Sequence, residues 1–215
     1  ASNEKEAPLA QRPAGRLMVD SLTAVSPSGS SILRGLSFVV EPGQTVAVLG
    51  PTGSGKSTLL RCLMGVWPRT SGLIRLDATP LGEIDRRAIG GWLGFLPQSS
   101  DLAPGTIGEN VARFSEATPE AIEAAVRMAD ATAMIEALPK GLDTEVGEAG
   151  AHLSAGQRRR IALARALFGA PALVCLDEPE ANLDRDGEVA LARALQQLKA
   201  AGSTVLIAAH RPSVV

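Results

Sequence analysis

The stretch GPTGSGKST, from Gly50 to Thr58, constrains the fold of this chain more than any other. It matches the pattern G-x-x-x-x-G-K-[ST]. It follows a short apolar run, Thr45 to Gly50, and leads into a segment of helical character, roughly Lys56 to Met64. A strand that passes through a glycine-rich turn into a helix is the context that this pattern requires. The stretch therefore predicts a phosphate-binding loop at the end of a buried strand.

The residues of this loop have distinct expected roles toward a nucleotide. Gly53 and Gly55 let the backbone curl so that its N–H groups surround phosphates. Lys56 would bring a positive charge to the β- and γ-phosphates, and the Ser57 hydroxyl would bind Mg²⁺. The alternative, a glycine-rich turn with a solvated lysine, does not account for the flanking strand and helix. The predicted ATP-binding residues of the loop are Gly50, Pro51, Thr52, Gly53, Ser54, Gly55, Lys56, Ser57 and Thr58.

The rest of the chain mostly alternates between strands and helices. Two predicted strands, 16–25 and 31–40, precede the loop. A helical stretch, 106–138, interrupts the alternation, with Thr118 as a predicted N-cap and Pro119 at the first helical position. We therefore expect an α/β fold with a mostly parallel sheet, an antiparallel β subdomain and a helical insertion. The remaining predicted elements are strands at 72–78, 91–98, 172–177 and 204–210 and a helix at 187–201.

Composition narrows the functional classes. The net charge of −2 and the absence of tyrosine argue against a nucleic-acid coat or a base-stacking surface. No apolar run approaches the roughly 20 residues needed to span a bilayer. Residues 1–16 are polar and resemble a linker rather than a signal peptide. Cys62 and Cys175 lie in apolar stretches, which indicates buried thiols in a reducing compartment.

Two acids follow an apolar strand. The stretch ALVCLDEPE, from Ala172 to Glu180, contains Asp177 and Glu178 at the end of its apolar part. In α/β folds, such strand ends face the crevice where ligands bind. Asp177 would hold Mg²⁺, and Glu178 would polarise the water that attacks the γ-phosphate. One of the two could instead cap the segment that follows.

Three other polar residues are ambiguous when each is taken alone. Gln98 follows Pro97 at a strand end, where its amide could reach a metal or a water. A lone histidine is usually a surface residue, and His152 is interpreted as one. His210 closes a core strand near the phosphate loop, which favours a functional interpretation.

The stretch HLSAGQRRRIALARAL, from His152 to Leu167, predicts a helix whose first turn is built from small residues. The unpaired N–H groups of such a turn form an anion site. Ser154 and Gln157 also fit a capping box, in which each side chain accepts from the backbone N–H of the other. Both interpretations stay open from the residues alone. The three arginines at 158–160 are expected to form mostly a solvated helix face, although one of them could position a neighbour.

Together these stretches resemble the nucleotide-binding domain of ABC transporters. From about Leu17 to Val215, the phosphate loop, Gln98, LSAGQ, LVCLDE, ANLD and His210 occur in the order of that family's motifs. The resemblance implies ATP and Mg²⁺ as cofactors and ATP hydrolysis as the activity. It implies that Glu178, His210, Lys56 and Gln98 are catalytic and that Ser57, Gln98 and Asp177 surround the metal.

The resemblance also implies a second copy of the chain as a partner. In this family, the LSAGQ helix of one subunit contacts ATP held in the phosphate loop of the other. Two ATP molecules would then lie in a symmetric head-to-tail dimer. The residues expected to face the partner's ATP are Leu153, Ser154, Ala155, Gly156, Gln157 and Asp184.

Some stretches resemble exporters within this family. DTEVGEAG, from Asp143 to Gly150, is similar to a segment whose Glu145 and Glu148 would couple to membrane domains. LPQSSDLAPGTIGENVARF and EPEANLD resemble bacterial type I secretion ATPases, which export proteins. The implied partners are transmembrane domains that precede this domain in a longer chain, a periplasmic adaptor and an outer-membrane channel. The implied location is the cytoplasmic face of the bacterial inner membrane.

The resemblance also suggests domain boundaries. We expect a linker at 1–16 and an ATP-binding domain at 17–215, with a helical subdomain at about 99–168 and a C-terminus short of the family's last helices. The chain departs from the family pattern where an aromatic residue usually stacks on adenine, and Val25 or Pro27 could offer an apolar platform there. Since base–aromatic stacking is worth about 1–3 kcal/mol, nucleotide affinity is expected to be low.

Other functions remain possible on the sequence. The same domain could serve an exporter of lipids, peptides or drugs. A soluble ABC ATPase that acts on DNA or ribosomes would be expected to carry a basic surface, which this composition does not favour. A regulatory module without turnover would lack a catalytic base, but Glu178 is present.

Overall fold

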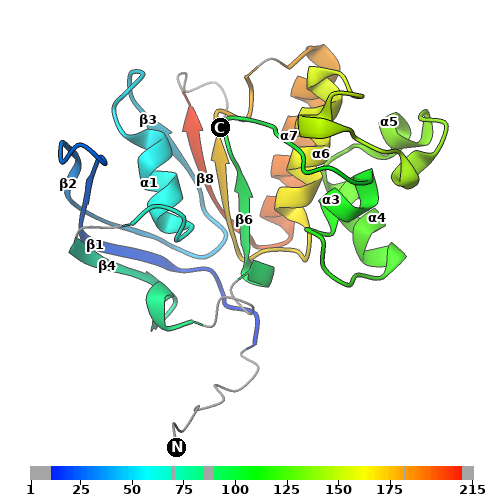
Figure 1. The fold of residues 1–215 in the computed structure, drawn as a ribbon. Helices are drawn as coiled ribbons and strands as arrows, with labels where there is room; N and C mark the ends of the chain where they lie inside the picture. The colour runs from blue at the N-terminus through cyan, green and yellow to red at the C-terminus, as the bar shows by residue number, and fades with distance from the viewer. Residues whose placement is uncertain (1–10, 69–70, 85–89, 182, 210–215) are drawn as a thin grey trace, which may run out of the picture.

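The computed structural model describes residues 11–68, 71–84, 90–181 and 183–209, and Figure 1 shows their arrangement. Within these ranges the strands form two four-stranded sheets. The first is antiparallel, with the order β2 (Ser31–Val40), β1 (Leu17–Val25), β4 (Ser71–Leu76) and β5 (Thr79–Pro80). The second is parallel, with the order β3 (Thr45–Leu49), β8 (Thr204–Ala209), β7 (Leu173–Asp177) and β6 (Leu93–Leu96). The expected parallel core and antiparallel β subdomain are confirmed.

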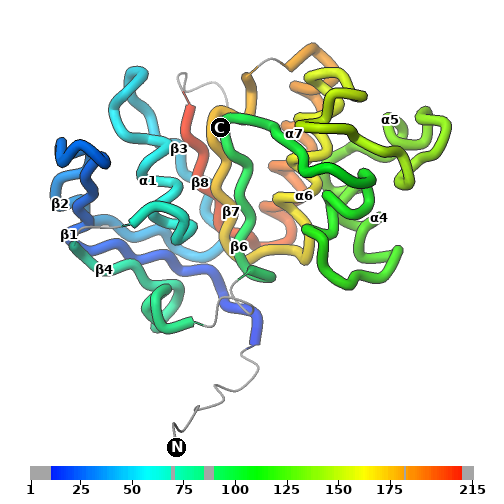
Figure 2. The backbone as a smooth tube through the Cα atoms, in the orientation of Figure 1, coloured from blue at the N-terminus to red at the C-terminus, as the bar shows by residue number. Residues whose placement is uncertain are grey.

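Helices cover both faces of the parallel sheet. α1 (Lys56–Leu63) lies between the two sheets, whereas α6 (Ala155–Leu167) and α7 (Arg185–Ala200) lie on the opposite face (Figure 1; Figure 2). The expected helical insertion lies beyond α6 in both views. It contains α3 (Ile107–Val111), α4 (Pro119–Met128) and α5 (Thr132–Glu136). Short 3-10 turns lie before the insertion, at η1 (Leu81–Glu83), and after α5, at η2 (Gly141–Asp143) and η3 (Glu148–Gly150).

The side chains of β7 divide the core into two parts. Leu173 and Cys175 pack with α1 and the antiparallel sheet, whereas Val174 and Leu176 pack with α6 and α7. This alternation is that of a strand covered on both faces, and all of β7 is buried. Asp177 follows in the same alternation and is therefore directed toward α1, the helix that begins at the phosphate loop.

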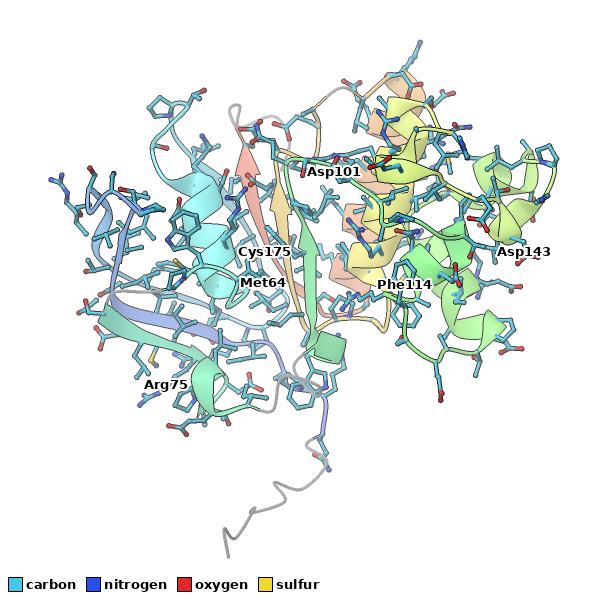
Figure 3. All side chains as sticks on the ribbon, in the orientation of Figure 1. Met64, Arg75, Asp101, Phe114, Asp143 and Cys175 are labelled. Atoms are coloured by element: carbon cyan, nitrogen blue, oxygen red, sulfur yellow. The ribbon has the colours of Figure 1, made fainter. Side chains whose placement is uncertain are left out.

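Both cysteines are buried, as expected. Cys175 lies in the centre of the molecule (Figure 3), and burial raises the pKa of its thiol. Across the described ranges, no group of three or more His, Cys, Asp and Glu residues could hold a metal. Nor does any helix within those ranges combine the length and the apolar character that crossing a membrane requires.

Capping residues set the helix boundaries. Thr118 is the N-cap of α4 and Pro119 its first residue, as predicted. The helical stretch expected at 106–138 consists of three short helices, α3, α4 and α5. α7 begins at Arg185, two residues before the predicted start, because the carboxylate of Asp184 accepts from the Gly187 N–H at 2.8 Å.

Arg113 fastens the helical insertion to the parallel sheet. From a left-handed backbone position, φ +55°, its guanidinium donates to the carbonyls of Leu93 at 3.1 Å and Ala166 at 3.1 Å. It also donates to the carbonyls of Gly90, Arg165 and Phe168. One side chain thus joins the end of α3, the start of β6 and the end of α6. Burial lowers the pKa of this guanidinium.

Candidate functional site

The phosphate loop connects β3 to α1 through a backbone that only glycine adopts easily. Gly53 has φ +79° and Gly55 has φ +93°. A Cβ at Gly55 would lie 3.0 Å from Cγ2 of Ile32, so this position also has little space for a side chain. Residues 51–54 are exposed. The predicted loop is confirmed in its local geometry.

Lys56 extends back over the loop. Its Nζ donates to the carbonyl oxygens of Gly50 at 2.7 Å and Pro51 at 3.1 Å, and only 7% of the residue is exposed. The loop therefore holds a positive charge close to its own backbone. A phosphate group that enters the loop would find a lysine already oriented toward it.

Asp177 and Ser57 lie together beneath the loop. The Ser57 hydroxyl donates to Oδ1 of Asp177 at 3.0 Å. Asp177 is completely buried, and within the described residues its Oδ2 has no hydrogen-bond partner. Burial raises the pKa of this carboxyl, and the hydrogen bond from Ser57 opposes that rise. An orphaned carboxylate oxygen beside a hydroxyl is a donor set that fits Mg²⁺.

Asp177→Asn should change how stability depends on pH. Because burial raises the folded-state pKa of Asp177, its protonated form favours folding. That contribution is complete below the unfolded pKa of about 4 and is lost as pH rises through the folded pKa. The variant does not titrate at this position, so its unfolding temperature minus that of the wild type should increase from about pH 4 to pH 7. Thermal unfolding without nucleotide or Mg²⁺ measures this.

The surface variant Glu116→Gln serves as the control, because it removes an exposed carboxyl rather than a buried one. A difference between Asp177→Asn and the wild type that stays constant, or that decreases with pH, would contradict the predicted sign.

Gln98 and Glu178 form a pair at neighbouring strand ends. Gln98 follows β6 and Glu178 follows β7, and Nε2 of Gln98 donates to Oε2 of Glu178 at 2.9 Å. The Glu178 backbone is left-handed, φ +48°, and its N–H donates to the carbonyl of Ala208 at 2.8 Å. The structure thus brings together Ser57, Gln98, Asp177 and Glu178 at one edge of the parallel sheet. His210 lies outside the described residues.

The prediction of a solvated arginine face is wrong for Arg159. This residue is 5% exposed, and its guanidinium donates to the backbone carbonyls of Pro97, just after β6, and Asp177, the last residue of β7. Its spacing from Ala162 and Leu163, three and four positions later, is that of one helix face, and both are buried. Arg158 and Arg160 are also followed by buried residues three and four positions later, so this spacing alone does not single out Arg159. Arg158 and Arg160 are half-buried, and Nη2 of Arg160 lies 3.9 Å from Oδ1 of Asp184.

The capping box at the start of α6 is confirmed. Oγ of Ser154 accepts from the Gln157 N–H at 3.2 Å, and Oε1 of Gln157 accepts from the Ser154 N–H at 2.8 Å. Ser154 and Ala155 are nevertheless exposed, Gly156 is half-buried and Leu153 is buried. Since an accepting hydroxyl still has its own proton to donate, capping does not prevent Ser154 from contacting an anion.

The start of α6 does not join the cluster around Asp177. α1 and α6 lie on opposite faces of the parallel sheet (Figure 1), so LSAGQ and the phosphate loop belong to different sides of one chain. Of the other predicted residues, Val25 is half-buried at the end of β1, and Glu145 and Glu148 are exposed. His152 is exposed as expected, with Nδ1 at 3.1 Å from the Glu145 carbonyl.

A family model described as ABC transporter matches residues 33–181. The chain is 46% identical over 215 residues to the type I secretion system ATP-binding protein PrsD of Rhizobium meliloti (strain 1021), covering 99% of this chain and 37% of that protein. It is 39% identical over 204 residues to the ATP-dependent lipid A-core flippase of Saccharophagus degradans, covering 94% and 35%. These relatives are thus nearly three times as long as the matched region.

A solved structure shares the same fold. The structure of a bacterial Atm1-family ABC exporter with ATP bound superposes with a TM-score of 0.86 at 32% sequence identity. The match covers 98% of this chain and 37% of that chain. The antiparallel sheet, the parallel sheet and the helical insertion therefore all have counterparts in that protein.

Proposed function

Since this chain belongs to the ABC transporter family, we propose that it binds and hydrolyses ATP as the nucleotide-binding part of an exporter. The observation that carries the proposal is the cluster of Ser57, Asp177, Gln98 and Glu178 beside the phosphate loop. Phosphoryl transfer to water needs a loop that binds the phosphates, oxygen atoms that could bind a metal ion, and a base.

Each residue of the cluster has a separate role in this proposal. Lys56 and the loop N–H groups bind the phosphates, and Ser57, Asp177 and Gln98 would hold Mg²⁺. The ion would neutralise charge on the phosphate oxygens when bound. Glu178 accepts a hydrogen bond from Gln98 and orients the attacking water. We assign His210, at the end of the last predicted strand, to the γ-phosphate.

We further propose that two copies of the chain bind two ATP molecules head to tail. The exposed start of α6 supports this, because it lies on the face of the sheet opposite to α1 and cannot serve the loop of its own chain. The residues proposed to face the partner's ATP are Leu153, Ser154, Ala155, Gly156, Gln157 and Asp184. Val25 is proposed to lie beside adenine in the absence of an aromatic residue.

Protein export of the type I kind is the substrate class that we propose. The 46% identity to a type I secretion system ATP-binding protein supports it. Lipid export is the second candidate, supported by 39% identity to a lipid A-core flippase. In either case, transmembrane domains would be the direct partners, with Glu145 and Glu148 in contact with them. An adaptor, an outer-membrane channel and a location at the cytoplasmic face of the inner membrane belong to the type I proposal.

A domain exchange tests this proposal. This chain would replace the matching part of the Rhizobium meliloti protein, and secretion through that system would be measured in a strain that lacks the native gene product. We expect secretion to return with this chain and to fail with its Lys56→Ala variant, which should express equally. A parallel exchange into the lipid A-core flippase should restore little function. Restoration in the flippase alone would favour lipid export instead.

A further inference from the structure

Arg159 is a charged side chain enclosed between the ends of two strands. It belongs to the second turn of α6, whose first residues carry LSAGQ, and it is 5% exposed. A buried guanidinium is costly unless its N–H groups are all satisfied. The identity of its acceptors therefore indicates which part of the molecule it holds.

One edge of the guanidinium binds the segment after β6. Nη1 donates to the carbonyl oxygens of Pro97 at 2.8 Å and Gln98 at 3.1 Å, and to Oγ of Ser100 at 3.0 Å. The backbone on both sides of the Gln98 side chain is thus fixed by a single donor.

The other edge binds the segment after β7. Nη2 donates to the carbonyl oxygens of Asp177 at 3.0 Å and Glu178 at 2.6 Å. Nε lies 3.5 Å from the carbonyl oxygen of Pro179. Burial lowers the pKa of this guanidinium, and the charges of Asp177, Glu180 and Glu178 oppose that shift. The acceptors are backbone atoms, so the carboxylate of Glu178 stays directed to Gln98.

The backbone that Arg159 holds at Glu178 is unusual. Its φ of +48° is a conformation that non-glycine residues seldom adopt and that persists only when neighbours fix it. Here the Glu178 N–H donates to the Ala208 carbonyl, and the Glu178 carbonyl accepts from Nη2 of Arg159. Both peptide groups of the candidate base are therefore held, one by β8 and one by α6.

We propose that Arg159 is a positioning residue that sets Gln98 and Glu178 relative to each other and ties both to the helix that begins with LSAGQ. The inference rests on the proposed ATP hydrolysis. Arg159 acts on Gln98 and Glu178 through their backbone carbonyls, to which its guanidinium donates. Because those bonds are rigid and forked, a shift of α6 on contact with a partner's ATP moves the Gln98–Glu178 pair in the same chain.

Kinetics of Arg159→Gln test the proposal. Without the guanidinium that binds both strand ends, Glu178 should be misplaced and kcat should fall about 10²-fold. KM for ATP should change less than about twofold, because the phosphate loop is unchanged. Arg159→Lys keeps the charge but offers one ammonium for two strand ends, so it should lie between wild type and Arg159→Gln.

Arg113→Gln is the matched control. Arg113 is a half-buried arginine that also donates to several backbone carbonyls, but it binds the far end of α6. Both glutamine variants should unfold at lower temperature than the wild type, and kcat would be expressed per folded molecule. Arg113→Gln should retain the wild-type kcat. If the wild type, Arg159→Gln and Arg113→Gln had equal kcat values, the proposal would be overturned.

A double variant separates positioning from general damage. If Arg159 acts through Glu178, adding Arg159→Gln to Glu178→Gln should not lower the single-turnover rate further. If the double variant instead lost the product of the two single-variant factors in its single-turnover rate, the proposal would be overturned. A wild type without ATP hydrolysis would instead refute the proposed function, whereas an active wild type with an equally active Arg159→Gln would refute only this inference.

Discussion

Glu178→Gln should lower the rate of ATP turnover by about 10²–10⁴-fold and leave ATP binding close to that of the wild type. The amide keeps the size of the carboxylate and can still accept from Nε2 of Gln98, so the local geometry survives. It loses the negative charge that would polarise water. The Lys56 contacts with the loop and the Ser57–Asp177 pair are unaffected.

Phosphate release at saturating ATP and Mg²⁺ measures the turnover, and fluorescence of a labelled ATP analogue measures the binding. Lys56→Ala provides the complementary control, because it should lose binding as well as turnover. A Glu178→Gln protein that hydrolyses ATP at the wild-type rate would remove Glu178 from the role of base. The water would then have to be oriented by another group.

Ser154→Arg should abolish ATP-dependent dimerisation. The start of α6 is open because Ser154, Ala155 and Gly156 are small, and an arginine side chain would fill the space that a partner's phosphate needs. The experiment uses the Glu178→Gln background, in which ATP persists. We expect the mass by light scattering to double on addition of ATP and Mg²⁺, and to stay that of a monomer once Ser154→Arg is present.

Loss of a helix cap is the competing explanation, since replacing an N-cap costs about 1 kcal/mol. Thr106→Arg controls for it, because Thr106 and Glu109 form a second capping box at the start of α3. That variant should weaken its helix to a similar extent and still dimerise with ATP. If Thr106→Arg also prevents the dimer, or if Ser154→Arg permits it, then α6 does not contact the partner's nucleotide through its first turn.

The parts of the site that sequence patterns predict are those defined by neighbouring residues. The phosphate loop, the capping box of Ser154 and Gln157, and the acids that follow β7 each lie within a few positions along the chain. Their geometry depends on local turns and on the position of a strand end. Gln98 was identified from the order of the family's motifs, and its Nε2 lies 2.9 Å from Oε2 of Glu178.

The parts that the sequence did not predict depend on long-range packing. Arg158, Arg159 and Arg160 are chemically identical, and only the direction of α6 against β6 and β7 decides which one is enclosed. Arg113 is similar, since its acceptors lie 20 to 55 positions away along the chain. The breaks between α3, α4 and α5 arise at turns with left-handed residues such as Arg113 and Asp130.

The strand order of the parallel sheet has a consequence for biosynthesis. Within the described residues, β3 pairs only with β8, so Thr45 bonds in register with Val205 and Leu49 with Ala209. A ribosome therefore has to synthesise all residues from Gly50 to β8 before the strand that leads into Gly50 gains its neighbour. Such distant pairing is slow to form. The ability to retain a nucleotide should consequently emerge late, close to the end of translation of this region, when the last strand docks.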